Sequence, residues 1–185
     1  MNDYLALISK YTQGEHEQTV PAFIIHSALV TKKALDIAQK YMQKNPDVRI
    51  DLRLLEEMGM LHDIGIFRTQ TPPLFTRGQG PYITHFTHGA DILESERLFR
   101  HAQAAKTHSD ITKEEIVAQK LPLPAEDHVP TTPEEEIISL ADKYYTKRFK
   151  ELFYERSVEE IREYLAGYGQ GAVTRFNELH AKYCE

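Results

Sequence analysis

Three polar side chains lie on helix faces that the hydrophobic pattern predicts to be buried. His26, His62 and Asp142 each continue an apolar stripe at helical spacing, and Asp63 directly follows His62. A buried carboxylate is costly unless it is paired, hydrogen-bonded or bound to a cation. Two imidazoles and two carboxylates suit a divalent ion such as Mn²⁺, Fe²⁺, Zn²⁺, Ni²⁺, Co²⁺ or Mg²⁺. These four side chains are therefore candidate ligands of a metal centre.

The His62-Asp63 dipeptide is informative because of the residues around it, and not by itself. Because the chain holds nine histidines, a His-Asp pair arises readily by chance. Here the pair ends an amphipathic helix, precedes an Ile-Gly pair, and follows the inward-facing His26 by 36 residues. A different reading of the same residues is an internal polar network that only stabilises the helices.

The elements that must position these side chains are helical almost throughout. Apolar spacing predicts helices over 26–41, 52–63 and 85–107, with further helices starting at 112 and 132 and two more over 157–183. Thr112, Thr132 and Ser157 each precede an acid by three residues, which is a helix-start pattern. Residues 68–84 and 121–133 are rich in proline, glycine or threonine and are predicted to be loops. The expected class is all-α.

Composition limits the class of protein further. The chain has 185 residues and one cysteine, Cys184, which favours one domain without disulfides in a reducing cytoplasm. We expect a core over about 20–150 and C-terminal helices over about 157–183. No stretch resembles a signal peptide or a membrane span. A net charge of −6 argues against a nucleic-acid partner, because phosphate backbones attract basic surfaces.

The order of these residues resembles that of the HD-domain metal-dependent phosphohydrolases of the HDIG type. The resemblance runs from IIHSALVTKKAL through LHDIG to ADK, and ITKEEIVAQKLPLPAEDHVPTTPEEEIISLADKYY looks like the corresponding part of that subgroup. It implies a single-domain helical bundle. It also implies that His26, His62, Asp63 and Asp142 bind one divalent ion.

The same resemblance extends to two further histidines. Some members of the family hold a second metal with two histidines between the His-Asp pair and the last aspartate. His85 precedes Gly89-Ala90 at the matching spacing, and His108 is the candidate for the other position. The alternatives are a hydrogen-bonded core histidine for His85 and a surface loop position for His108. Without a second metal, either residue could act as the general acid.

The function that the resemblance implies is hydrolysis of a phosphomonoester, phosphodiester or phosphoanhydride by a metal-activated water. Asp63 would bind metal and accept a hydrogen bond from the attacking water. The substrate would be a nucleotide or another small phosphorylated metabolite. Arg68 and Lys106, which lie near proposed ligands in the sequence, are candidates for binding phosphate oxygens, although solvated side chains are the alternative. The loop over 68–84 is where we expect substrate selection.

Two other classes of function stay open. One is a non-catalytic regulatory domain that binds a nucleotide at the metal centre, and the other is a purely structural helical protein. A homodimer through the tyrosine-rich C-terminal segment is a further alternative. His88 follows His85 by three residues and could share its face, but nothing else supports a functional role, so a surface role is favoured. For the remaining histidines no spacing or stripe argument supports a functional role; they are His16, His101, His128 and His180. Lys143 points away from the face of Asp142, which argues against direct contact with substrate.

Overall fold

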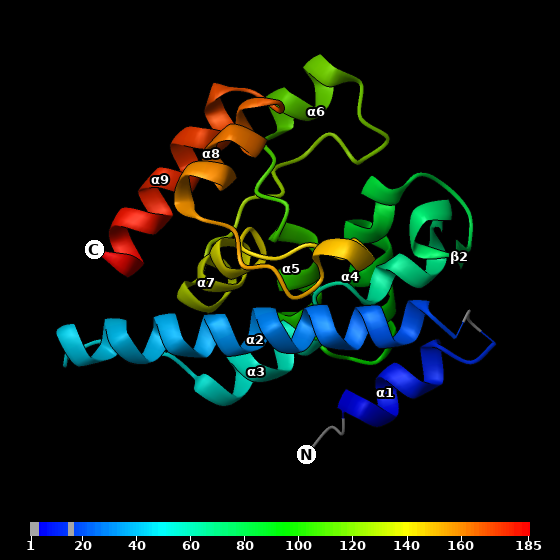
Figure 1. Cartoon of the computed structure of the whole chain (residues 1–185), viewed down its shortest axis with the longest axis horizontal. Helices are drawn as coiled ribbons and strands as arrows, with labels where there is room; N and C mark the ends of the chain where they lie inside the picture. Colours follow the sequence, from blue (N-terminus) through cyan, green and yellow to red (C-terminus); the bar gives the residue numbers. More distant parts are fainter. Residues whose placement is uncertain (1–3, 15–16) are drawn as a thin grey trace.

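The computed structural model of the chain describes residues 4–14 and 17–185. Within them it contains nine α-helices and one two-stranded sheet (Figure 1). The α-helices are α1 (Tyr4–Tyr11), α2 (Thr19–Lys44), α3 (Leu52–Leu61), α4 (His85–Ser95), α5 (Phe99–Thr107), α6 (Lys113–Gln119), α7 (Pro133–Asp142), α8 (Val158–Ala166) and α9 (Gln170–Cys184). Short 3-10 helices are η1 (Ile64–Arg68), η2 (Pro72–Leu74), η3 (Tyr82–Thr84) and η4 (Phe149–Glu151). The predicted all-α class is confirmed.

Two clusters of buried apolar side chains share α2 and α3. One cluster takes Phe23 from α2 and Leu61 from α3, together with residues of α1, η1, α4 and α5. The other takes Val30 from α2 and Met58 from α3, together with residues of α7, α8 and α9. His26 therefore lies on α2 between the contributions to the two clusters.

None of the helices in the described residues has the length and apolar character that a membrane span requires. That residues 1–185 form one domain stays a prediction.

The helix starts predicted from capping patterns are present. Thr112 and Ser157 begin α6 and α8 with reciprocal capping boxes. Thr132 caps α7: its Oγ1 accepts a hydrogen bond from the backbone N–H of Glu135 at 3.4 Å, and Pro133 occupies the first helical position. This cap fixes the start of the helix whose last residue is Asp142.

Replacing Thr132 with alanine is expected to lower the free energy of unfolding by about 1 kcal/mol, because the cap hydrogen bond is lost. Urea unfolding followed by circular dichroism measures the change. Thr132→Ser is the matched control, since serine keeps the capping oxygen. Equal losses in both variants would contradict the assignment of the cap.

Three predicted segments differ from the structure. The single helix expected over 85–107 is divided into α4 and α5, because Arg97 adopts a left-handed backbone with φ of 61° and ends the first helix. No glycine or proline marks this break. The expected loop over 68–84 contains η2, η3 and a hairpin in which β1 (Gln70–Thr71) pairs with β2 (Thr76–Arg77). The helix expected over 52–63 ends at Leu61, so that His62 and Asp63 lie just beyond it.

Gly65 allows η1 to approach the start of α4 very closely. A Cβ atom on Gly65 would lie 2.0 Å from the carbonyl oxygen of His85 and 2.4 Å from the backbone nitrogen of Gly89. Both neighbours are backbone atoms, which cannot rotate away. Gly65 thus allows Asp63 and His85 to lie near each other.

Gly65→Ala is expected to destabilise the fold by about 3 kcal/mol, because η1 and α4 must separate to admit a methyl group. Urea unfolding measures the loss. Gly171→Ala is the control: its Cβ would meet Glu115 Oε1 at 2.9 Å, the end of a flexible side chain, and we expect a change within about 1 kcal/mol. Similar losses in the two variants would show that the close approach is unimportant.

Candidate metal centre

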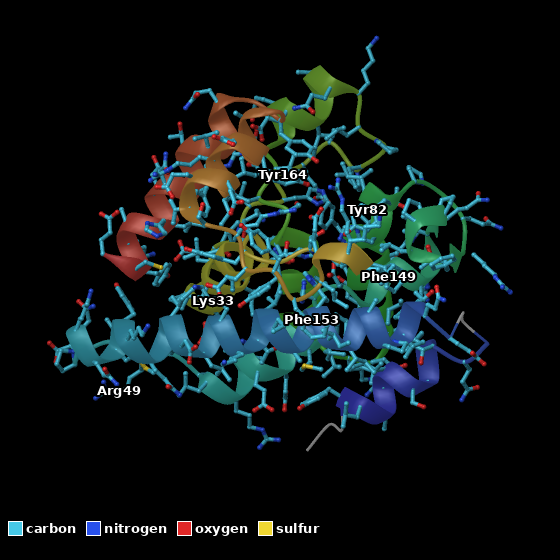
Figure 2. The ribbon with its side chains drawn as sticks, viewed as in Figure 1. Lys33, Arg49, Tyr82, Phe149, Phe153 and Tyr164 are labelled. Atoms are coloured by element: carbon cyan, nitrogen blue, oxygen red, sulfur yellow. The ribbon has the colours of Figure 1, made fainter. Side chains whose placement is uncertain are left out.

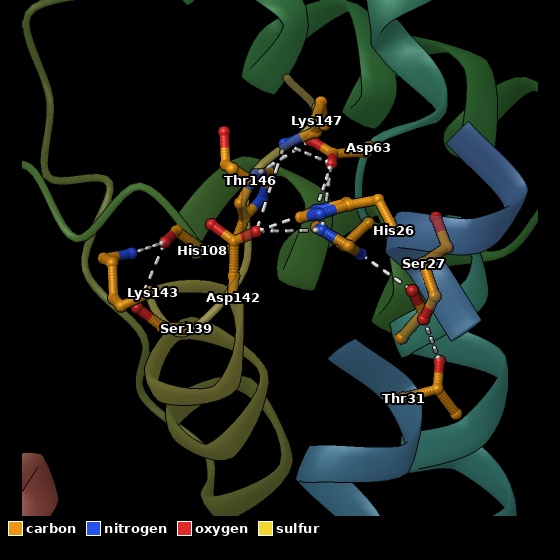
Figure 3. A network of polar contacts seen from close by, with 12 residues as sticks. His26, Ser27, Thr31, Asp63, His108, Ser139, Asp142, Lys143, Thr146 and Lys147 are labelled. Atoms are coloured by element: carbon orange, nitrogen blue, oxygen red, sulfur yellow. Dashed lines mark hydrogen bonds and ion pairs between the residues drawn. The ribbon is translucent and has the colours of Figure 1, made fainter. Parts of the chain in front are cut away.

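The first set of donors converges from three helices. His26 lies on α2, His62 and Asp63 directly follow α3, and Asp142 is the last residue of α7. Asp63 Oδ2 lies 3.1 Å from His26 Nε2 and 3.1 Å from His62 Nε2. Asp142 Oδ1 lies 3.1 Å from His26 Nε2 and 3.4 Å from His62 Nε2 (Figure 3). One ligand atom from each of these four residues fits within 4.8 Å of the others, so the set could hold one ion.

The second set shares Asp63 with the first. Asp63 Oδ1, the other carboxylate oxygen, lies 3.1 Å from His85 Nε2 and 3.4 Å from His108 Nε2. Asp63, His85 and His108 again offer donor atoms within 4.8 Å of one another. The two oxygens of Asp63 thus face different histidine pairs, as in a carboxylate that bridges two ions.

Three imidazoles are held with the same orientation. Nδ1 of His62 donates to the carbonyl of Gly59 at 2.7 Å. Nδ1 of His85 donates to Tyr82 at 2.6 Å, and Nδ1 of His108 donates to Ala105 at 2.8 Å. Because a carbonyl can only accept, the proton of each neutral ring is on Nδ1, and Nε2 presents a lone pair. Histidine ligands of metals are typically oriented by such a bond from the second nitrogen.

Several donor atoms at this centre lack a hydrogen-bond partner in the described residues. They are His62 Nε2, His85 Nε2 and both carboxylate oxygens of Asp63, all fully buried. The two oxygens have close ion-pair contacts instead, of which the shortest is from Lys147 Nζ to Oδ2. Buried polar atoms in folded proteins are normally satisfied, so a group of them that converges needs an explanation. Cations held by the two donor sets would satisfy these atoms together, and the residues therefore fit a metal.

Several ionisable groups of the centre have shifted pKa values. Burial raises the pKa of Asp63, but His62 and Lys147 outweigh it and lower that pKa well below its usual range. Burial raises the pKa of Asp142 too, and Lys147 with His26 lowers it well below. Burial lowers the pKa of His62, yet the neighbouring carboxylates raise it to about 9. Two carboxylates thus remain anionic inside the fold and require positive charge beside them.

The pKa of His108 is shifted in the opposite direction from that of His62. Burial is the main cause that lowers its pKa to about 4, with Asp63 opposing the shift. The ring is therefore neutral at physiological pH. Its side chain is 2% exposed, so the surface-loop alternative is wrong. The carbonyl of His108 accepts hydrogen bonds from Lys143 Nζ at 2.8 Å and Ser139 Oγ at 3.1 Å, which anchors this residue to α7 (Figure 3).

Sequence reasoning missed Lys147. Its Nζ lies 2.5 Å from Asp63 Oδ2 and 4.0 Å from Asp142 Oδ1, and its side chain is 10% exposed. Burial lowers the pKa of this lysine, but Asp63 and the groups around it raise it well above the ordinary value. A permanent ammonium therefore faces the metal centre. The residue follows the end of α7 by five positions, where no helical period indicates the direction of a side chain.

The two predicted substrate residues lie in different surroundings. Arg68 is exposed at the end of η1, next to the hairpin. Lys106 lies on α5, and its Nζ forms an ion pair with Glu126 Oε1 at 2.8 Å. Neither residue has an ion pair with Asp63 or Asp142 among those that the structure describes.

The other histidines lie outside the two donor sets. His101 Nε2 contacts Glu57 Oε2 at 3.0 Å, and His180 Nδ1 lies 3.5 Å from Glu185. His128 is fully buried beside the bridge that its backbone forms with Ile111. His88 is half-buried on α4. His16 lies outside the described residues.

The fold and the centre define an all-helical protein with a buried histidine–aspartate cluster. The family model of the HD domain matches residues 23–147, a range that contains all six donors. The chain belongs to the HD domain family, which is a family of metal-dependent phosphohydrolases. The resemblance found in the sequence is confirmed.

Three relatives are similar to this chain. An uncharacterized protein of Methanocaldococcus jannaschii is 35% identical over 66% of this chain and 67% of its own length. A tRNA (cytidine(56)-2'-O)-methyltransferase of Thermoplasma volcanium is 35% identical over 79% of this chain, and one of Picrophilus torridus is 38% identical over 50%. The matches span only 37% and 24% of these two methyltransferases. No solved structure matches the chain significantly.

Proposed function

We propose that the protein is a metal-dependent phosphohydrolase. His26, His62, Asp63 and Asp142 bind one divalent ion, and Asp63, His85 and His108 bind a second. The observation that carries this proposal is the convergence of buried Nε2 and carboxylate atoms without hydrogen-bond partners, on rings whose Nδ1 atoms are already engaged. Membership of the HD domain family supports the same reaction class.

A divalent ion bound there would polarise a phosphoryl oxygen and lower the pKa of a water molecule. The chain itself supplies the position and the charge. Asp63 has one oxygen towards each histidine pair. Its carboxylate can accept a hydrogen bond from a water molecule that lies between the two pairs. The neutral His108 offers a lone pair, which favours a ligand over a general acid. Lys147 binds phosphoryl oxygens and offsets the charge that develops on them.

The substrate in this proposal is a nucleotide or another small phosphorylated metabolite. Two relatives carry the names of enzymes that act on a cytidine of tRNA, which supports a nucleotide. A net charge of −6 disfavours an extended nucleic acid. Arg68, at the base of the hairpin, would bind phosphate, whereas Lys106 would first have to leave Glu126. Substrate selection by residues 68–84, a homodimer and a cytoplasmic location stay predictions.

Elemental analysis beside a phosphate-release screen tests the function. The purified protein is supplied with each of Mn²⁺, Fe²⁺, Zn²⁺, Ni²⁺, Co²⁺ and Mg²⁺ and assayed on nucleotides and sugar phosphates. We expect two ions per chain and product from at least one substrate. His62→Ala should lose the ion of the first set and the product, while Lys150→Met, a change in an exposed side chain, should lose neither.

The alternative functions give different results in the same experiment. A regulatory domain would bind metal and a nucleotide tightly but release no product after prolonged incubation. A structural helical protein would hold no metal, and chelation would leave its thermal stability unchanged. Activity fully retained in the His62→Ala variant would overturn the proposal.

A further inference from the structure

Two phenylalanine side chains stand exposed and contact each other. Phe75 is 40% exposed and Phe149 is 41% exposed. Their ring centroids are 5.7 Å apart, and the rings are tilted by 56°. We call Phe75 and Phe149 the aromatic pair. The two residues come from segments far apart in sequence, the hairpin before α4 and the 3-10 helix η4 after α7.

Lys147 relates the aromatic pair to the candidate metal centre, because it is close to Phe149 in the chain and contacts Asp63. Lys147 precedes Phe149 by two residues, so their Cα atoms are at most about 7 Å apart. Its Nζ contacts Asp63 Oδ2 at 2.5 Å and lies 5.7 Å from the ring centroid of Tyr82. The ring of Tyr82 in turn lies 4.4 Å from that of His85, a donor of the second set. Figure 2 labels Tyr82 and Phe149 among the side chains.

The backbone holds Phe75 in its exposed position. Its φ is 59°, a left-handed conformation that is uncommon for a bulky residue and that often accompanies a binding site. Its N–H donates to Pro72 at 3.0 Å, and the preceding carbonyl of Leu74 accepts from Thr19 Oγ1 on α2 at 2.7 Å. Thr76 Oγ1 accepts a hydrogen bond from Thr71 across the hairpin at 3.0 Å. The backbone that carries the ring is therefore held in place before any ligand binds.

An exposed aromatic surface two residues along the chain from an ammonium that contacts a donor set for cations suits a ligand that combines a flat ring with a phosphate. Flat heterocycles stack on aromatic side chains with little dependence on their substituents. The aromatic pair alone is too small to form a stable interface with a second copy of the chain. Two rings exposed to this extent offer at most about 200 Å², whereas a stable interface buries about 1,200 Å² or more.

We propose that Phe75 and Phe149 form a subsite that stacks the base of a nucleotide whose phosphate lies at Lys147 and the metal centre. This inference rests on the proposed function and narrows its substrate class to nucleotides. The pair selects for the base, and phosphorylated compounds without an aromatic ring use only the phosphate end of the site. Stacking on one aromatic side chain contributes about tenfold or more to affinity.

Matched pairs of compounds test the subsite. AMP is compared with ribose 5-phosphate, and ATP with tripolyphosphate, in the metal-supplemented protein. The wild type should favour the compound with the base, in kcat/KM and in equilibrium binding. Phe149→Ala and Phe75→Ala should each lower that preference by about tenfold or more, and Phe149→Tyr should restore it. Phe153→Ala is the matched control, because Phe153 is 74% exposed in the same segment and is not part of the pair.

The outcomes separate this inference from the proposed function. If no compound is hydrolysed, the proposed function fails, and the preference for AMP over ribose 5-phosphate in binding alone still tests the pair. A preference that is absent in the wild type, or unchanged in both alanine variants, overturns the subsite. So does an equal loss in Phe153→Ala. A change of oligomeric state in Phe149→Ala without a change of preference would show an interface between copies and would also overturn it.

Discussion

Replacing Asp63 with asparagine is expected to remove metal from both donor sets and to lower phosphate release by about a thousandfold or more. Asp63 is the residue that the two sets share, with Oδ2 towards His26 and His62 and Oδ1 towards His85 and His108. Asparagine keeps the shape of the side chain but has no charge and one oxygen. Elemental analysis and phosphate release measure the two effects.

Variants that touch one set at a time are the controls. Asp142→Asn should lose the ion of the first set, and His85→Gln should lose the ion of the second, so each should retain part of the metal that Asp63→Asn loses. Wild-type metal content in Asp63→Asn would contradict a shared ligand. Equal content in all three variants would contradict two separate sets.

The stability of Asp63→Asn needs a separate measurement. The change leaves Lys147 and His62 buried beside a neutral amide, and breaking a buried ion pair from one side costs about 3–5 kcal/mol. The double variant Asp63→Asn, Lys147→Met removes both charges and should recover part of that loss. Urea unfolding of both variants separates a metal effect from a folding effect.

The metal centre was predictable where helical spacing fixes the direction of a side chain. His26 and Asp142 lie on buried faces of α2 and α7, and the apolar period places them there before any contact is known. His62 is the residue that directly follows α3, and the same stripe continues into it. Hydrophobic period and helix caps, both local properties, thus determined most of the fold class and the first donor set.

The features that sequence missed depend on irregular backbone. Lys147 follows α7 in a segment with no period, and its approach to Asp63 results from the path of that segment. The break at Arg97 uses a left-handed residue without glycine. His108 could be read as a loop residue, because only the end of α5 and the bonds from Ser139 and Lys143 turn it inward. Tertiary contacts determine where the side chains of such irregular segments point, and a local sequence pattern does not show them.

Lys147→Met is the second variant with a large expected effect. The ammonium of Lys147 stays charged and faces the carboxylates that hold the ion, so it is the protein's own cation at the phosphate end of the site. Removing one such preorganised group lowers kcat by about 10² to 10³. Metal content should not fall, because Lys147 is a competitor of the ion for Asp63 and not a ligand. Affinity for the ion, measured by calorimetry, should rise.

The combination of lower kcat with undiminished metal distinguishes Lys147 from the donors. A loss of metal together with activity would show that the lysine supports the structure of the centre. Lys150→Met is the matched control, because Lys150 lies in the adjacent η4 and is exposed. Equal loss of kcat in that variant would assign the effect to the charge of the segment as a whole. Lys147→Arg should recover part of kcat, since a guanidinium keeps the charge but is broader than an ammonium and fits the narrow approach to Asp63 less well.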